Sequence, residues 1–234
     1  MSYDRRIELI HILLSRTNGE VYQGPFKGMK ILPKWSWGDG DVGGKVLGVY
    51  ESELFPAIET AIANNPDLVL NIGCAEGFYG IGLAMRTGRK TILFDLMESA
   101  ISIARENANA NGVNNILFSN ECTAEVYQHY LSQASNPLVV MDCEGAEDQL
   151  LDLSVIPALA KTSIIVESHD CNIPGLTNKL IGRFKDTHNI QVIEQGAKNP
   201  YTEITRDFSD WDKMLLCCEF RPSTMFWLYL TPKT

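Results

Sequence analysis

Short apolar runs alternate with helix-like segments along most of this 234-residue chain. Their length and residue types predict seven buried strands, over residues 67–73, 91–95, 115–120, 137–142, 163–168, 190–195 and 224–230. Between them, apolar spacing predicts helices over residues 51–64, 79–86, 99–111, 123–132 and 178–187, and a partly helical stretch over 149–159. Strands separated by helices imply an α/β fold with a doubly wound, seven-stranded, mostly parallel sheet. No clear helix joins the last two strands, so we expect them to pair antiparallel at the sheet edge.

The beginning of the chain follows a different pattern, and we interpret residues 1–48 as an N-terminal extension and 49–234 as the main domain. Apolar positions between Asp4 and Arg16 predict an amphipathic helix that packs on this domain. Residues 19–48 are rich in Gly and Trp, which indicates an irregular segment, a short hairpin or a mobile cover over the acceptor side. Residues 196–222 are polar and contain no motif that we can assign.

Composition and charge restrict the class of protein. The net charge is −9, which disfavours a nucleic-acid binder because such proteins usually present basic surfaces to phosphates. The six cysteines include no CxxC pair, so neither a zinc site nor a disulfide framework is indicated. The N-terminus lacks the apolar core of a signal peptide, and no apolar run is long enough to span a bilayer. We therefore expect a cytoplasmic protein with reduced thiols; the sequence does not predict its oligomeric state.

Three glycines follow the first strand of the main domain, in the segment LNIGCAEGFYGIG. At the carboxyl end of that strand, Gly73 permits a tight turn, Gly77 a close approach to a ligand, and Gly80 close packing of the next helix. Asp95 ends the second strand, 22 residues after Gly73, where an acidic side chain can accept both hydroxyls of a ribose. As an alternative to ligand binding, these glycines would serve only the packing of the helix on the strand. The combination favours a cofactor that contains a nucleoside, either a nicotinamide dinucleotide or S-adenosylmethionine.

Other features favour S-adenosylmethionine. A short-chain dehydrogenase needs a Tyr-x3-Lys pair on a helix, and the one such spacing, from Tyr229 to Lys233, lies in the terminal strand. Glu76, inside the glycine loop, would repel a pyrophosphate, whereas a sulfonium and an ammonium tolerate a carboxylate nearby.

Three motifs resemble class I methyltransferases of the FkbM type. VLNIGCAEGFYGIGLA is similar to their first motif, VVMDCEGAEDQLL (residues 139–151) to their Asp-x-Glu-Gly-Ala-Glu motif, and IIVESHD (164–170) to the end of their fifth strand. The resemblance covers residues 50–170 and departs at Asn71, where an acidic residue is common. It implies a Rossmann-like methyltransferase fold, S-adenosylmethionine as methyl donor, and a hydroxyl acceptor on a small molecule or glycan. It also implies cofactor contacts from Asn71, Gly73, Cys74, Ala75, Gly77, Asp95, Glu121, Cys122, Thr123 and Asp142.

Polar side chains at the ends of the fourth and fifth strands are the catalytic candidates. We expect His169 to act as the general base, because its ordinary pKa suits proton abstraction near neutral pH. Asp142 would orient the cofactor or the acceptor, and Glu144 would bind a substrate hydroxyl or cap the next helix. Glu147 we interpret as a solvated helix residue. As an alternative mechanism, a divalent cation such as Mg²⁺ would bind among Asp142, Glu167, His169 and Asp170.

Three functions remain open at this point. The first is O-methylation of a small molecule or glycan. The second is methylation of a nucleic acid, which the acidic balance and the lack of basic runs disfavour. The third is a non-catalytic subunit that binds S-adenosylmethionine.

Overall fold

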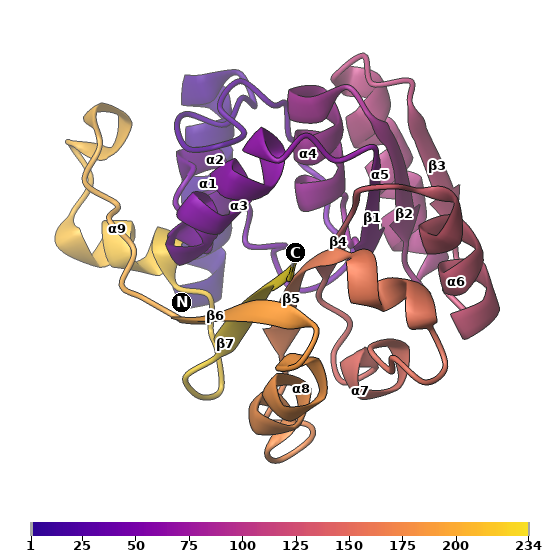
Figure 1. The fold of residues 1–234 in the computed structure, drawn as a ribbon. Coiled ribbons are helices and arrows are strands. Elements are labelled where there is room, and N and C mark those ends of the chain that lie inside the picture. Colours follow the sequence, from indigo (N-terminus) through magenta and orange to yellow (C-terminus); the bar gives the residue numbers. More distant parts are fainter. Residues whose placement is uncertain (1, 234) are drawn as a thin grey trace.

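A seven-stranded sheet forms the centre of the computed structural model, which describes residues 2–233 (Figure 1). The strand order is β3-β2-β1-β4-β5-β7-β6. β1 to β5 pair in parallel, and β7 lies antiparallel between β5 and β6. The strands are β1 (Leu68–Ile72), β2 (Lys90–Phe94), β3 (Ile116–Ser119), β4 (Pro137–Met141), β5 (Ser163–Ser168), β6 (His188–Glu194) and β7 (Phe226–Pro232). The predicted seven-stranded, mostly parallel sheet and the antiparallel pairing of its last two strands are confirmed.

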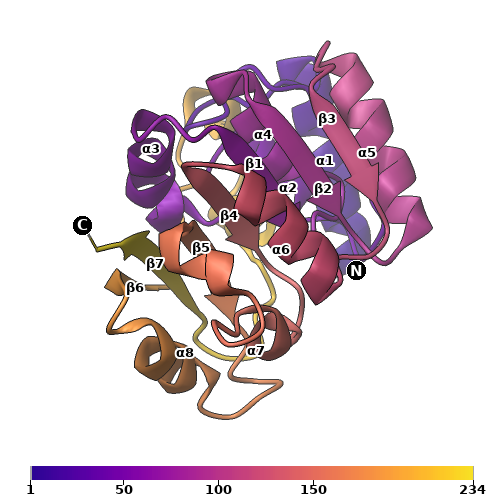
Figure 2. The same ribbon diagram turned by 45° about the vertical axis from the view of Figure 1, so that its right-hand side comes forward.

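Helices cover both faces of the sheet (Figures 1 and 2). They are α1 (Ser2–Thr17), α2 (Val42–Leu47), α3 (Phe55–Ala63), α4 (Phe78–Thr87), α5 (Glu98–Ala110), α6 (Ala124–Gln133), α7 (Glu147–Leu150), α8 (Leu176–Phe184) and α9 (Asp210–Cys217). Short 3-10 turns occur at η1 (Ser52–Leu54), η2 (Pro157–Lys161) and η3 (Glu203–Thr205). Among the described residues, no helix is both long and apolar enough to cross a membrane.

Two hydrophobic clusters hold these layers together. Successive residues of a strand face opposite sides of a sheet, so Val69 joins the cluster beneath α1 to α5, whereas Leu70 joins the cluster beneath α6 and α8. All residues of β1 and β4 are buried, as expected for central parallel strands covered on both faces. This packing fixes the carboxyl ends of β1, β4 and β5, where the candidate site lies.

The N-terminal extension packs into the first of these clusters. Leu9, Ile10 and Leu13 of α1 are fully buried there, as the amphipathic pattern predicts. Arg6 is also buried, and its guanidinium pairs with the carboxylates of Asp39 and Asp41. Two buried ion pairs therefore anchor the Gly- and Trp-rich segment to α1. The division of the chain at residue 48 stays a prediction.

Helices α2 and α9 form in the two segments that we predicted to be irregular or without assignable structure. Gly43 explains how they pack, since a Cβ at this position would lie 2.7 Å from the carbonyl oxygen of Leu216 in α9. Ser209 caps α9 by accepting a hydrogen bond from the backbone N–H of Asp212. The hairpin expected in the extension is reduced to one antiparallel bridge, between Glu20 and Lys30. Glycine content lowers helix propensity, so the packing of α2 against α1 and α9 explains why this helix forms.

Candidate active site

The glycine loop after β1 makes a close backbone contact with the end of β4. Gly73 has a φ of +72°, and a Cβ there would lie 1.7 Å from the carbonyl oxygen of Asp142. The backbone N–H groups of Gly73 and Cys74 both donate to the carbonyl oxygen of Phe94, at 2.9 Å. The loop therefore joins the carboxyl ends of β1, β2 and β4, and the missing side chain of Gly73 makes this close approach possible.

Asp95 shapes this loop from the end of β2. One carboxylate oxygen accepts a hydrogen bond from the N–H of Ala75 at 2.8 Å, and the other accepts from the N–H of Met97 at 2.9 Å. The contact helps to hold Ala75 in a left-handed conformation, with a φ of +45°. A carboxylate has further lone pairs, which fit ribose hydroxyls. Next to Asp95, the Leu96 side chain is 81% exposed. Leu96 is therefore a candidate for packing against a cofactor base, and we did not select this residue from the sequence.

Other predicted cofactor residues have structural partners. The buried Asn71 amide accepts a hydrogen bond from the N–H of Gly80 at 3.0 Å, which joins β1 to α4. Thr123 caps α6 by accepting a hydrogen bond from the N–H of Val126. Glu121 is exposed beside the half-buried Cys122, at the end of β3. Contacts between these residues and a cofactor stay predictions.

Glu76 does not lie free in the loop. One of its carboxylate oxygens accepts hydrogen bonds from the backbone N–H and the hydroxyl of Ser36, and the other lies 3.8 Å from Nζ of Lys45. Glu76 is 7% exposed. Its charge is turned toward the N-terminal segment, so repulsion of a pyrophosphate by Glu76 no longer discriminates between the two cofactor classes.

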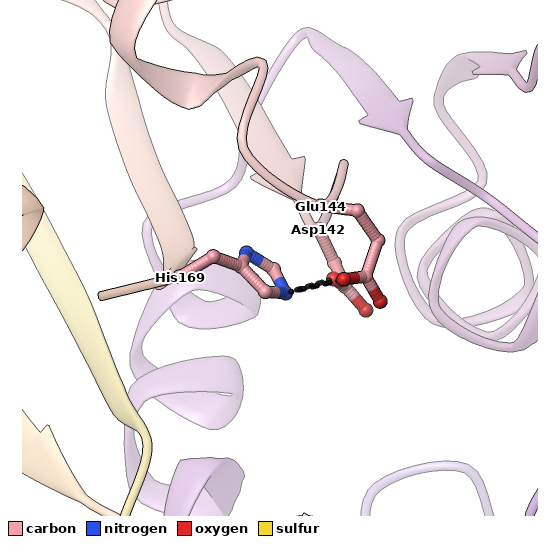
Figure 3. Close-up of side chains that lie close together, drawn as sticks. All are labelled: Asp142, Glu144 and His169. Atoms are coloured by element: carbon pink, nitrogen blue, oxygen red, sulfur yellow. Dashed lines mark ion pairs between the residues drawn. The ribbon is translucent and has the colours of Figure 1, made fainter. Parts of the chain in front are cut away.

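Three catalytic candidates come together at the carboxyl ends of β4 and β5 (Figure 3). Nε2 of His169 lies 3.4 Å from a carboxylate oxygen of Asp142 and 3.5 Å from one of Glu144. Donor atoms from the three side chains all lie within 4.8 Å of one another, a spacing that also suits a metal ion. The structure therefore brings together all three residues that we proposed for catalysis.

His169 is buried and held by a second carboxylate. Its Nδ1 lies 2.8 Å from Oε1 of Glu147, which assigns the proton to Nδ1 and leaves Nε2 facing Asp142 and Glu144. Burial lowers the pKa of His169, but the hydrogen bond with Glu147 and the charges of Asp142 and Glu144 outweigh it and raise the pKa. Glu147 has no exposed surface, so its interpretation as a solvated residue is wrong.

Glu167 lies beside His169 and connects the site to Arg221. Burial and the charge of Asp142 raise the pKa of Glu167 to about 11. An Nη1 atom of Arg221 lies 2.6 Å from Oε1 of Glu167, and another nitrogen of this guanidinium pairs with the buried Glu51. Glu51 also accepts a hydrogen bond from the Tyr79 hydroxyl. We did not select Glu51 or Arg221 from the sequence, because neither lies in a motif. Asp170 instead accepts a hydrogen bond from the Thr177 hydroxyl.

Replacing Asp95 with alanine should weaken binding of S-adenosylmethionine by about 1–3 kcal/mol, the cost of leaving polar partners unpaired. The change removes the acceptor of two backbone N–H groups as well as the candidate ribose contact. Calorimetric titration of the variant measures the loss. Asp186→Ala, beyond the end of α8, is a matched control that removes one exposed carboxylate far from the glycine loop along the chain. Equal affinity in Asp95→Ala and the unchanged protein would contradict the assignment.

Comparisons with known proteins agree with this arrangement. A family model described as a methyltransferase domain matches residues 65–212. Cofactor-bound Rv0187 from MTB has a similar fold, with a TM-score of 0.53 at 15% identity over 80% of this chain and 83% of that one. The putative methyltransferase yhhF from Escherichia coli gives a TM-score of 0.52 at 14% identity over 91% and 97%. An rRNA methylase from Streptococcus thermophilus gives 0.50 at 12% identity over 78% and 97%. No curated protein matches the sequence.

At these identities the solved structures support the fold alone. The assignment of the chain to a family rests on the family model. It spans more than half of the chain, including the glycine loop, Asp95 and the three side chains at the ends of β4 and β5. The carboxylate of Asp95, which lies at the end of β2 beside the glycine loop, fits the ribose of S-adenosylmethionine. The chain therefore belongs to the methyltransferase domain family and is a class I methyltransferase that depends on S-adenosylmethionine.

Proposed function

We propose that this protein transfers the methyl group of S-adenosylmethionine to a hydroxyl oxygen of a small molecule or glycan. The observation that carries the proposal is His169, whose Nε2 faces the carboxylates of Asp142 and Glu144 beside the glycine loop. An aliphatic hydroxyl is a poor nucleophile while it keeps its proton, so a nearby acceptor for that proton is valuable. The FkbM-like motifs that contain these residues support the same chemistry.

The bound cofactor supplies a methyl carbon that its sulfonium has already activated. The oxygen–carbon bond forms as the sulfur–carbon bond breaks, and the electron pair of the broken bond stays on sulfur, giving a neutral thioether. Nε2 of His169 receives the hydroxyl proton, and Glu147 stabilises the resulting imidazolium through Nδ1. Asp142 and Glu144 hold the acceptor in line with the methyl group.

We also propose that residues 35–44 cover the acceptor side of the site. Ser36 contacts Glu76 in the glycine loop, so this segment lies beside the loop, which supports the proposal. The ion pairs of Arg6 with Asp39 and Asp41 anchor it, so any movement would be confined to the part around Trp37, which is 46% exposed. Limited proteolysis with and without S-adenosylhomocysteine tests this, and a cleavage rate that the ligand leaves unchanged would contradict it.

The function is tested by binding and by transfer. We expect micromolar binding of S-adenosylmethionine and S-adenosylhomocysteine in calorimetry, without binding of NADH. Incubation with methyl-labelled cofactor and fractionated cell extract should label a small molecule or glycan in a linkage that is stable to nuclease. Label in RNA or DNA would instead favour a nucleic-acid methyltransferase, which the net charge of −9 disfavours. Cofactor binding without methyl transfer to any fraction would favour a non-catalytic subunit. This third outcome would also contradict the proposal of O-methylation.

A further inference from the structure

We propose that Asp142, Glu144 and His169 bind a divalent metal ion that holds the acceptor of the methyl group. The three side chains offer two carboxylate oxygens and one imidazole nitrogen, all within 4.8 Å of one another. The proposal of a metal site rests on the spacing of these donor atoms. The role of the metal in holding the acceptor rests on the function proposed above.

His169 supplies an observation that is independent of the acidic side chains. Its side chain is 2% exposed, and within residues 2–233 its Nε2 has no hydrogen-bond partner. Buried polar nitrogens are rarely left in this state, because the lost hydrogen bond costs free energy. Nε2 points between the carboxylates of Asp142 and Glu144, at distances longer than hydrogen bonds (Figure 3). A metal ion between these donors satisfies the nitrogen.

The other ring nitrogen has the partner that metal-binding histidines usually have. Nδ1 contacts Oε1 of Glu147 at 2.8 Å, and the same oxygen accepts a hydrogen bond from the N–H of Cys143 at 3.1 Å. A carboxylate on the far side of a histidine fixes its tautomer, orients the ring and increases the basicity of the coordinating nitrogen. Glu147 is fully buried, so this orientation is rigid.

The charge around the three donors also fits a dication. Asp142, Glu144 and Glu147 each have a carboxylate oxygen within 3.5 Å of a ring nitrogen of His169. The guanidinium of Arg221 pairs with Glu167 and Glu51. Concentrated negative charge in a partly buried site is costly unless a cation compensates it.

The donor set indicates the class of metal and of substrate. One imidazole together with carboxylates suits Mn²⁺, which accepts nitrogen as well as oxygen donors, better than Mg²⁺, which prefers oxygen donors. Three protein ligands leave coordination positions open, and an acceptor with two adjacent oxygens, such as a vicinal diol, can chelate there. The metal would lower the pKa of the bound hydroxyl. With Nε2 on the metal, the hydroxyl proton leaves to solvent past Glu144, whose side chain is 78% exposed.

The test is Mn²⁺ binding to the full chain without cofactor or acceptor, measured by electron paramagnetic resonance and calorimetry. We expect one Mn²⁺ per chain. Asp142→Asn and Glu144→Gln should each weaken binding by more than about tenfold, and Glu147→Gln by about 10–100-fold through its histidine. Glu144 is exposed, so its variant should fold even if Asp142→Asn does not. Asp186→Asn, beyond the end of α8, removes the same charge elsewhere and should leave binding unchanged.

Absence of a bound ion at about 1 mM Mn²⁺, or equal affinity in Glu144→Gln and Asp186→Asn, would overturn the metal site. The failure of each proposal is distinguishable. Methyl transfer that persists in EDTA, without Mn²⁺ binding, rejects the metal and leaves His169 as the proton acceptor. Specific Mn²⁺ binding without transfer to any hydroxyl rejects the proposed function and leaves the metal site.

Discussion

Alanine in place of His169 should lower turnover by about 10²–10⁴-fold, the range for loss of a positioned proton acceptor. The imidazole lies at the meeting point of Asp142 and Glu144, so its removal takes away either the group that receives the proton or a metal ligand. Within residues 2–233, neither the glycine loop nor Asp95 forms a side-chain hydrogen bond or ion pair with this ring, so the affinity for S-adenosylhomocysteine should stay within a few-fold. Single-turnover kinetics and calorimetry on the same preparation measure the two effects.

His129→Ala is the matched control for this variant. His129 is exposed on α6, where its ring contacts Gln133, so its loss should leave turnover and affinity unchanged. Full turnover in His169→Ala would contradict any role of this residue in the reaction. A parallel loss of cofactor affinity and turnover would instead show that the substitution disturbs the cofactor site.

Alanine in place of Gly73 should destabilise the protein and abolish tight cofactor binding. The new Cβ would lie 1.7 Å from the carbonyl oxygen of Asp142, so the backbone of the loop or of the end of β4 must move. Overpacking of this kind costs about 1–3 kcal/mol, and a φ of +72° adds about 1–2 kcal/mol for a residue with a Cβ. Displacement of the loop also disturbs the hydrogen bond between Ala75 and Asp95, the candidate ribose contact.

Gly88→Ala separates the two contributions. Gly88 has a similar φ of +66°, but a Cβ there would meet no atom within 4 Å. This control should therefore show the conformational cost alone and bind the cofactor normally. Urea denaturation measures the free energy of unfolding of both variants, and calorimetry their affinity for S-adenosylhomocysteine. Equal stability and equal affinity in the two variants would contradict the close approach of the glycine loop to β4.

Much of the fold was predictable because its elements have strong local patterns. β4 is a continuous apolar run, β1 is interrupted only by Asn71, and the parallel sheet follows from the alternation of such strands with helices. α2 was not predictable, since Gly43 and Gly44 are poor helix formers and the helix is stabilised by its contacts with α1 and α9.

The candidate site shows the same contrast. Residues at strand ends, such as Asp142 and His169, were found because the carboxyl ends of neighbouring parallel strands meet at one edge of the sheet. Glu147 was misjudged because the face on which a short helix is buried depends on its neighbours. Its carboxylate turns inward to the His169 ring, which lies 22 positions further along the chain.

The sequence by itself determined the order of strands and helices, the glycine loop, and the set of polar residues at the strand ends, because each depends on local spacing and on residue type. Only the tertiary structure decided which of these residues meet. Arg221 pairs with Glu51 across 170 positions, and Nε2 of His169 stays unpartnered beside two carboxylates. Such contacts depend on how the layers pack around the sheet, and local periodicity contains no information about distances between remote segments.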